Sequence, residues 1–232
     1  MNVLARLVLR VSGSQPLPPA WVVGLTGLVA LIAVLNTGSW RLAGKVITIA
    51  HEGGHALVSV LSGRRLQGIR LHADSSGVTY SRGKRRGLGL ALTAAAGYLT
   101  PPLLGAGAAA LLAARHPAAL LWLALVLLAA TFVAVRNAFG ALAVLATAGC
   151  VFAVSYFASA AAQAGFAYLF AWFLLLGGMR PALELASRRQ RRGVSDADQL
   201  ARLTRVPRGA WVTLFLLVCA AALALGTRLL IP

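Results

Sequence analysis

Seven long apolar stretches constrain this sequence more than any other feature. A helix needs about 20 mostly apolar residues to cross a bilayer, and most of the stretches approach or exceed that length. Because 59% of the 232 residues are apolar and only 12% are charged, a soluble domain, a disordered chain and a coiled coil are excluded. We predict an all-α polytopic membrane protein with about seven transmembrane helices, folded as one domain over 1–232. The stretches lie near 20–36, 40–62, 88–112, 117–135, 138–162, 164–179 and 209–230.

The charge distribution predicts how the chain is oriented in the membrane. Lys and Arg together number 22, against 5 Asp and Glu, and most of the basic residues fall in two loops, 63–87 and 180–208. With the N-terminal tail 1–19 in the cytoplasm and seven crossings, both basic loops are cytoplasmic, as the positive-inside rule requires. Arg41 and Lys45 then lie near the outer surface. The basic loops are expected to meet lipid headgroups rather than nucleic acid.

Two further features bear on location. The tail 1–19 lacks the long apolar core and the cleavage site of a signal peptide, so we expect it to remain as a cytoplasmic tail. The strong preference for Arg over Lys is typical of a GC-rich bacterial genome. The prediction is a multi-pass protein of a bacterial cell membrane, and the sequence does not predict its oligomeric state.

The first basic loop, 63–87, carries the signal of a short β-hairpin. Residues 66–72 and 77–81 contain β-branched and aromatic side chains, and the turn-forming cluster Ala-Asp-Ser-Ser at 73–76 separates them. Such runs on either side of turn residues are typical of two paired strands. We therefore expect a β-hairpin in the first cytoplasmic loop.

The stretch 40–62 contains the one pattern with clear chemistry, His51-Glu52-Gly53-Gly54-His55. Side chains four residues apart on a helix project from one face, so both imidazoles can bind one metal ion. Glu52 is placed to take a proton from water that zinc activates near pH 7, which equips the site to hydrolyse an amide bond. Ionisable side chains are costly inside a membrane and need a reason. The other reason available is a polar contact between packed helices.

A catalytic zinc site uses three protein ligands and keeps one position open, so a third ligand is needed. Four acidic residues remain as candidates, and each has an ordinary explanation. Asp74 is a common turn residue, and Glu184 can pair with a basic residue one helical turn later. Asp196 and Asp198 fit the first turn of a helix that begins at Ser195. The residues alone leave the third ligand open.

Five motifs in order along the chain resemble the site-2 protease family of intramembrane zinc metalloproteases, in particular its small bacterial branch without a PDZ domain. Only the first motif is specific by itself, but the five together cover most of the chain. The resemblance implies a helical bundle in the bilayer, a bound zinc ion and single-span membrane proteins as substrates. The motifs are HEGGHA at 51–56, SSGVTYSRG at 75–83, AGYLTPP at 96–102, RNAFG at 136–140 and SDADQLARLT at 195–204.

The resemblance also implies roles for two later residues. Site-2 proteases take a late Asp as the third zinc ligand, usually in a Leu-Asp-Gly sequence. The counterpart here is Ser-Asp-Ala at 195–197, which favours Asp196, followed by Asp198 and then Glu184. The family often carries an Asn-x-x-Pro whose Asn donates to the developing oxyanion. Asn137 is its counterpart, although Ala, Phe and Gly follow it here.

These features predict an intramembrane zinc metalloprotease in which the two motif histidines and Asp196 bind zinc, Glu52 is the general base and Asn137 assists. The site would lie near the cytoplasmic leaflet. A membrane protease that cleaves cytoplasmic-face segments would instead take Glu184 as its third ligand, and a non-catalytic zinc-binding membrane protein is the remaining alternative. One geometric question stands. The metal would lie roughly 12 Å from the cytoplasmic end of the helix 40–62, whereas Asp196 is expected in a cytoplasmic loop that would have to reach it.

Overall fold

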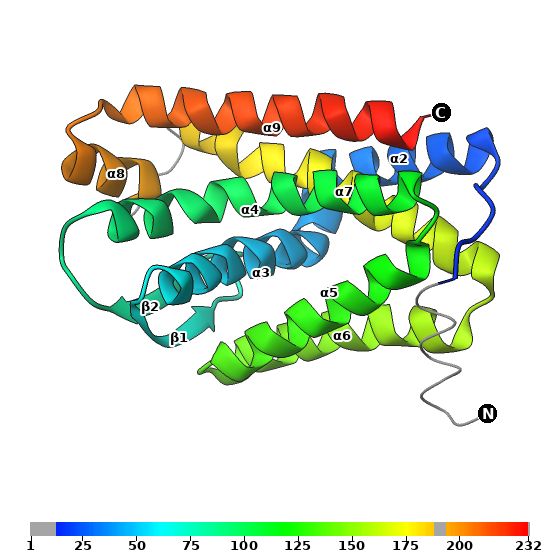
Figure 1. Cartoon of the computed structure of the whole chain (residues 1–232), viewed down its shortest axis with the longest axis horizontal. Helices are drawn as coiled ribbons and strands as arrows, with labels where there is room; N and C mark the ends of the chain where they lie inside the picture. Colours follow the sequence, from blue (N-terminus) through cyan, green and yellow to red (C-terminus); the bar gives the residue numbers. More distant parts are fainter. Residues whose placement is uncertain (1–12, 188–193, 232) are drawn as a thin grey trace.

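The predicted fold class is confirmed by a computed structural model, which describes residues 13–187 and 194–231. Residues 1–12 of the tail and 188–193 of the second basic loop lie outside the described residues. The described part is a bundle of helices with one two-stranded antiparallel hairpin (Figure 1). Its elements are α2 (Ala20–Leu35), α3 (Thr37–Leu61), β1 (Arg65–Leu71), β2 (Gly77–Arg82), α4 (Leu88–Ala113), α5 (Pro117–Ala134), α6 (Ala138–Phe157), α7 (Ala160–Ala186), α8 (Asp196–Thr204) and α9 (Arg208–Leu230).

The number of membrane crossings depends on how α2 and α3 are counted. Among the described helices, α4, α5, α6, α7 and α9 are each long and apolar enough to cross a bilayer. α2 has only 16 residues and α3 carries several polar ones, but together they qualify as one pair bent by 102°. At the bend, the Asn36 side chain accepts from the N–H groups of Gly38 and Ser39 and so caps α3. The structure thus supports five or six crossings rather than about seven.

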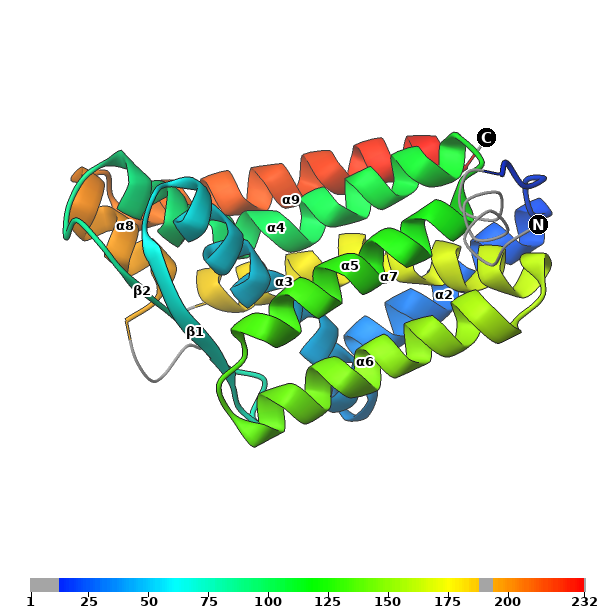
Figure 2. The ribbon, with the colours of Figure 1, turned by 60° about the horizontal axis from the view of Figure 1, so that its bottom comes forward.

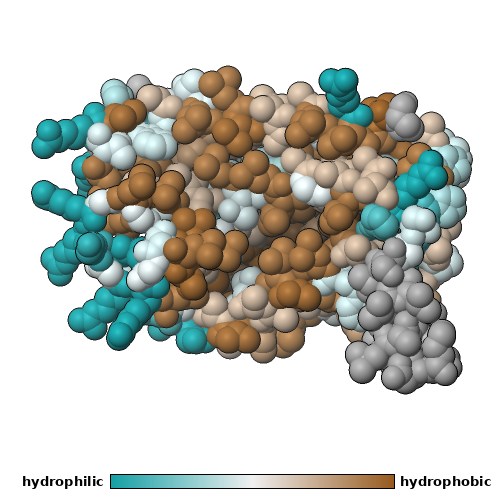
Figure 3. Space-filling model, in the orientation of Figure 1, coloured by the Kyte–Doolittle hydropathy of each residue, from teal (hydrophilic) through white to brown (hydrophobic). Residues whose placement is uncertain are grey.

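The arrangement of the helices gives the molecule two distinct ends. Figure 1 shows the hairpin and α8 at one end, and the start of α2 and the end of α9 at the other. On the face shown in Figure 3, strongly hydrophilic residues gather at the hairpin end and hydrophobic residues cover most of the middle. At the far end, the Gln15 N–H donates to the Arg115 carbonyl at 2.9 Å. The described part of the tail and the hairpin therefore lie at opposite ends, whereas the sequence placed both on one side, because the bent α2–α3 pair runs through the bundle once.

The hairpin is held on both sides of β1. β1 pairs antiparallel with β2, which confirms the predicted hairpin. The other edge of β1 meets the segment before α6, where Ile69 forms a parallel bridge with Val135. Gly68 permits this approach, since its φ is 148° and a Cβ there would collide with the Arg136 side chain.

The hairpin lies along α3 and does not extend away from the bundle (Figure 2). Lys45 Nζ donates to Ser75 Oγ at 2.9 Å and also to the Ala73 carbonyl. Thr48 Oγ1 donates to the Ser75 carbonyl at 3.0 Å. The turn is therefore held beside the first half of α3, and Lys45 lies at this turn.

Candidate metal centre

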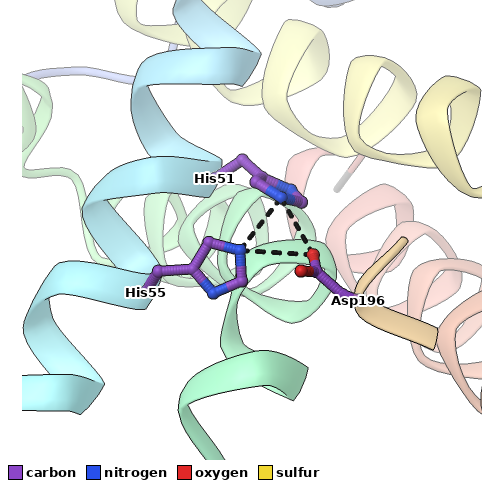
Figure 4. A group of neighbouring side chains, drawn as sticks. All are labelled: His51, His55 and Asp196. Carbon is purple, nitrogen blue, oxygen red and sulfur yellow. Dashed lines mark hydrogen bonds and ion pairs between the residues drawn. The ribbon is translucent and has the colours of Figure 1, made fainter. Parts of the chain in front are cut away.

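His51 and His55 lie one turn apart on α3, and their rings point toward Asp196, the first residue of α8 (Figure 4). The two Nε2 atoms are 3.1 Å apart. Each lies 3.2 Å from Oδ2 of Asp196. Among the described residues, these three side chains form the group that could hold a metal ion.

The spacing of the three donor atoms fits a tetrahedral zinc site. With metal–ligand bonds of about 2.0–2.1 Å, tetrahedral ligand atoms lie about 3.3 Å from one another. The separations of 3.1 and 3.2 Å in the structure are close to that value. Two imidazoles and a carboxylate are donors that zinc accepts, and three protein ligands leave a fourth position open.

The two rings are oriented by α4. The Nδ1–H of His55 donates to the Thr93 carbonyl at 2.7 Å. When Nδ1 carries the only ring proton, the Nε2 lone pair is free and directed at the site. Without a metal, a ring protonated on both nitrogens instead donates its Nε2–H to Asp196. His51 packs edge-on against the Tyr98 ring, with centroids 4.9 Å apart. Both imidazoles are thus arranged for binding by contacts that do not depend on an ion.

Gly97 of α4 keeps space open beside the histidines. A Cβ at this position would collide with the Nε2 atoms of both His51 and His55. Those are the atoms that would bind the metal, so any larger residue would fill the place where the ligands converge. The site therefore requires glycine at position 97.

Asp196 reaches the histidines because α8 is docked against the bundle. Ser195 Oγ accepts from the Asp198 N–H, and Asp198 Oδ2 accepts from the Ser195 N–H at 3.0 Å, which makes a capping box. Ala197 and Leu200 are fully buried in a cluster with residues of α4 and α9. This answers the geometric question, since Asp196 begins a docked helix and does not lie in a free loop.

The environment of Asp196 favours its charged form. Burial raises the pKa of Asp196, but hydrogen bonds with His51 and His55 outweigh it and hold the pKa well below its usual value. The position at the start of α8 also favours a negative charge. Asp196 is therefore ionised at neutral pH, as a metal ligand must be.

The other candidate third ligands have partners elsewhere. Glu184 pairs with Arg180 at 3.0 Å. Asp198 belongs to the capping box and pairs with Arg208 at 3.2 Å. Asp74 accepts hydrogen bonds within the hairpin turn. The structure therefore brings only one of the four candidate acids, among the residues it describes, to the histidines.

Glu52 lies against the hairpin beside the metal cluster. Its Oε2 accepts from Thr79 Oγ1 at 2.6 Å, and the residue is only 4% exposed. Gly77 is so close that a Cβ there would lie 2.6 Å from Glu52 Cγ. The candidate metal ligands, Glu52, β2 and the start of α8 all line one cavity of about 1340 Å³.

Asn137 holds the end of β1. Its Oδ1 accepts from the Leu71 N–H at 3.2 Å, and its Nδ2 donates to the Leu71 carbonyl at 2.7 Å. The side chain does not cap α6, and Asn137 does not belong to the metal cluster. Its use as an oxyanion donor stays a prediction, while the contact that the structure shows positions the hairpin.

Three contributors to the site were missed from the sequence, namely Thr79, Thr93 and Gly97. Thr79 and Gly97 fall inside the motifs SSGVTYSRG and AGYLTPP, which marked their segments but not their contacts. Thr93 contributes a backbone carbonyl, and no residue type signals that. These contacts arise from the packing of α3 against α4 and the hairpin.

A helical membrane bundle that combines an HExxH helix with a third carboxylate ligand defines the class of membrane-embedded metalloproteases. The family model described as Peptidase M50B-like matches residues 24–226, so the chain belongs to that family. This confirms the resemblance to site-2 proteases. Comparison with curated proteins and with solved structures finds no match.

Proposed function

We propose that the chain is an intramembrane zinc metalloprotease that cleaves single-span membrane proteins near the cytoplasmic leaflet. The observation that carries this is the convergence of His51, His55 and Asp196, with donor atoms 3.1–3.2 Å apart, next to the buried Glu52. A site that only stabilised the fold would not need a buried carboxylate at its side. Family membership supports the same reading.

In this proposal the two histidines and Asp196 would hold the ion and Glu52 would handle protons. When bound, zinc acts as a Lewis acid and makes water a competent nucleophile at neutral pH. Glu52 takes the proton of the attacking water and passes it to the leaving amine. The Thr79 hydroxyl donates a hydrogen bond to Oε2 of Glu52, which leaves Oε1 for this proton transfer.

The hairpin offers a place for an unwound substrate segment. β2 pairs with β1 along one edge, and its other edge has no strand partner among the described residues. Residues of β2 line the same cavity as the metal ligands. An extended peptide can add to such an edge as a further strand. We propose that β2 holds the substrate backbone while the scissile carbonyl lies at the metal site.

We also propose that the hairpin end faces the cytoplasm. It carries the basic residues between Arg64 and Arg86, whereas the described residues of the far end include Arg115 and Arg228. The positive-inside rule favours the hairpin end as the cytoplasmic one. The segment before α2 then lies on the opposite side, which revises the orientation predicted for the tail. Protease protection of a tag placed before α2 tests this in membrane vesicles.

The central test measures zinc content and cleavage together in purified, detergent-solubilised protein. We expect about one zinc per chain in the wild type, lost in His51→Ala and Asp196→Ala and kept in Glu184→Ala. Glu52→Gln should keep zinc and lose cleavage of single-span substrates. A folded wild type that takes up no zinc when supplied with it, or cleavage that survives Glu52→Gln, would contradict the proposal.

The same variants decide between the alternatives. A protease that uses Glu184 would lose zinc in Glu184→Ala, and the ion pair between Glu184 and Arg180 argues against it. A zinc protein without catalytic activity would bind zinc and show no cleavage both in the wild type and in Glu52→Gln. The wild type alone would not separate these functions.

A further inference from the structure

One polar stripe on α3 includes a residue that the metal site does not use. Arg41, Lys45, Thr48 and Glu52 follow one another at helical spacing along one face. Lys45 and Thr48 hold the hairpin turn, and Glu52 accepts from the hairpin residue Thr79. Arg41 is the next position on this stripe, one turn beyond Lys45. The hairpin ends at its turn and leaves Arg41 uncovered.

Arg41 has no neutralising partner in the part of the chain that the structure describes. Its side chain is exposed, and it lines the cavity that also contains His51 and Glu52. All 5 acidic residues of the chain are engaged elsewhere. Their contacts are Glu52 with Thr79, Asp74 with Ser76, Glu184 with Arg180, Asp196 with the two histidines and Asp198 with Arg208.

Arg41 also differs in depth from the other basic residues that line the cavity. Arg64, Arg82 and Arg85 belong to the hairpin end, where lipid phosphates neutralise exposed charge. Arg41 lies about 15 Å from His51 along α3, in the direction away from that end. Figure 1 shows the start of α3 near the middle of the length of the bundle. A charge at such a depth needs a specific partner or a water-filled cavity.

We propose that Arg41 binds a carboxylate carried by the transmembrane segment of the substrate. The inference rests on the proposed protease function and adds a rule for choosing substrates. An extended chain advances about 3.3 Å per residue, so about 15 Å corresponds to about five residues. The substrate would carry an Asp or Glu about five positions from the scissile bond, paired with the guanidinium through charge-assisted hydrogen bonds.

Such a pair would discriminate strongly among single-span proteins. Acidic residues are rare in transmembrane segments because their burial in lipid is costly. A segment that carries one would gain a partner by entering the cavity, while a purely apolar segment would leave Arg41 unpaired. A lipid phosphate is a less suitable partner, since phosphates lie at headgroup level.

The test measures binding rather than cleavage. The probes are synthetic single-span Leu/Ala peptides of about 24 residues, with Asp, Asn or Lys scanned along both sides of a central peptide bond. Zinc-loaded Glu52→Gln protein binds them in phosphatidylcholine nanodiscs, alone or combined with Arg41→Gln or Arg41→Glu. Arg228→Gln is the matched control, because Arg228 lies in the last turn of α9 and does not line the cavity.

We expect the Asp peptide to bind at least about tenfold more tightly than the Asn peptide when the acid lies about five residues from the centre. Arg41→Gln should abolish this preference, Arg41→Glu should shift it to the Lys peptide, and Arg228→Gln should preserve it. Equal affinities overturn the proposal. An Arg41→Gln effect seen only after phosphatidylglycerol is added also overturns it and assigns Arg41 to lipid. A preserved preference without cleavage by the Glu52-containing protein would sink the protease function and leave this assignment standing.

Discussion

The two helices that supply the candidate metal ligands are anchored in different ways. α3 has 25 residues and packs against α4 and the hairpin, and its His55 is oriented by an α4 carbonyl. α8 has nine residues and lies at the end of the bundle. It is held by the Ser195–Asp198 capping box and by the buried side chains of Ala197 and Leu200.

This difference indicates which part of the site metal binding would stabilise. The histidines are positioned by the bundle as a whole, so their geometry should persist without an ion. Asp196 depends on a few local contacts, so the complete site exists only while α8 is docked. Because a metal that binds only the complete site stabilises it, zinc affinity should follow the docking of α8 more closely than the stability of the bundle.

The largest effect is expected from Gly97→Ala, which tests whether the histidine side of the site is as fixed as this comparison requires. The added Cβ would collide with both Nε2 atoms, and a rigid bundle cannot move α3 aside. We expect zinc affinity to fall by about a hundredfold or more, measured by competition with a chelator. Gly107→Ala is the control on the same helix, since no atom lies within 4 Å of its Cβ position. Normal zinc content in Gly97→Ala would show that α3 and α4 adjust freely.

Thr79→Val tests how the hairpin positions Glu52 on α3. Removing the hydroxyl that donates to Glu52 should lower kcat by about ten- to a hundredfold, because a general base works only within hydrogen-bond reach of its proton. KM and zinc content should not change, since Thr79 is not a ligand. Thr79→Ser should restore most of kcat. A loss of zinc in Thr79→Val, or no rescue by Ser, would show that Thr79 supports the fold instead.

A pair of truncations compares the two helices directly. Leu200 of α8 is 0% exposed and Ile47 of α3 is 2% exposed, and truncation of such side chains to Ala costs about 2–5 kcal/mol. Leu200→Ala should lower zinc affinity at least about tenfold with little change in the unfolding temperature of the bundle. Ile47→Ala should lower the unfolding temperature of the bundle with little change in zinc affinity. Equal changes in both properties for both variants would mean that α8 is as integral to the bundle as α3.

The same contrast explains how much of the site the sequence could predict. His51 and His55 could be paired because a spacing of four residues on a helix determines their direction. Asp196 could not be selected from the residues alone, since each acid had an ordinary explanation and the docking of α8 is a tertiary event. Only the resemblance favoured it. Asn137 was assigned to the oxyanion by the same resemblance, and its contact with Leu71 was not foreseen.

The fold shows where hydropathy stops being informative. Apolar stretches predicted the helices and the turn-forming cluster predicted the hairpin, because both signals are local. Counting stretches could not reveal that the chain bends at Asn36, so α2 and α3 were taken as two crossings. With two crossings counted there, the tail was expected on the hairpin side, whereas its described residues 13–19 lie at the opposite end. The placement of the hairpin along α3 depends on contacts between residues far apart in sequence.

The smallest effect is expected from Ser195→Ala, which weakens α8 at its end and leaves its buried face intact. Loss of the capping hydroxyl typically costs about 1 kcal/mol, so zinc affinity should fall about fivefold. Ser195→Thr should keep wild-type affinity, because Thr also caps helices. Chelator competition on both variants, measured alongside Leu200→Ala, gives the ranking. If Ser195→Ala weakened zinc binding more than Leu200→Ala, the cap rather than the buried face would position Asp196, and α8 would act as a hinged carrier of the ligand instead of a docked helix.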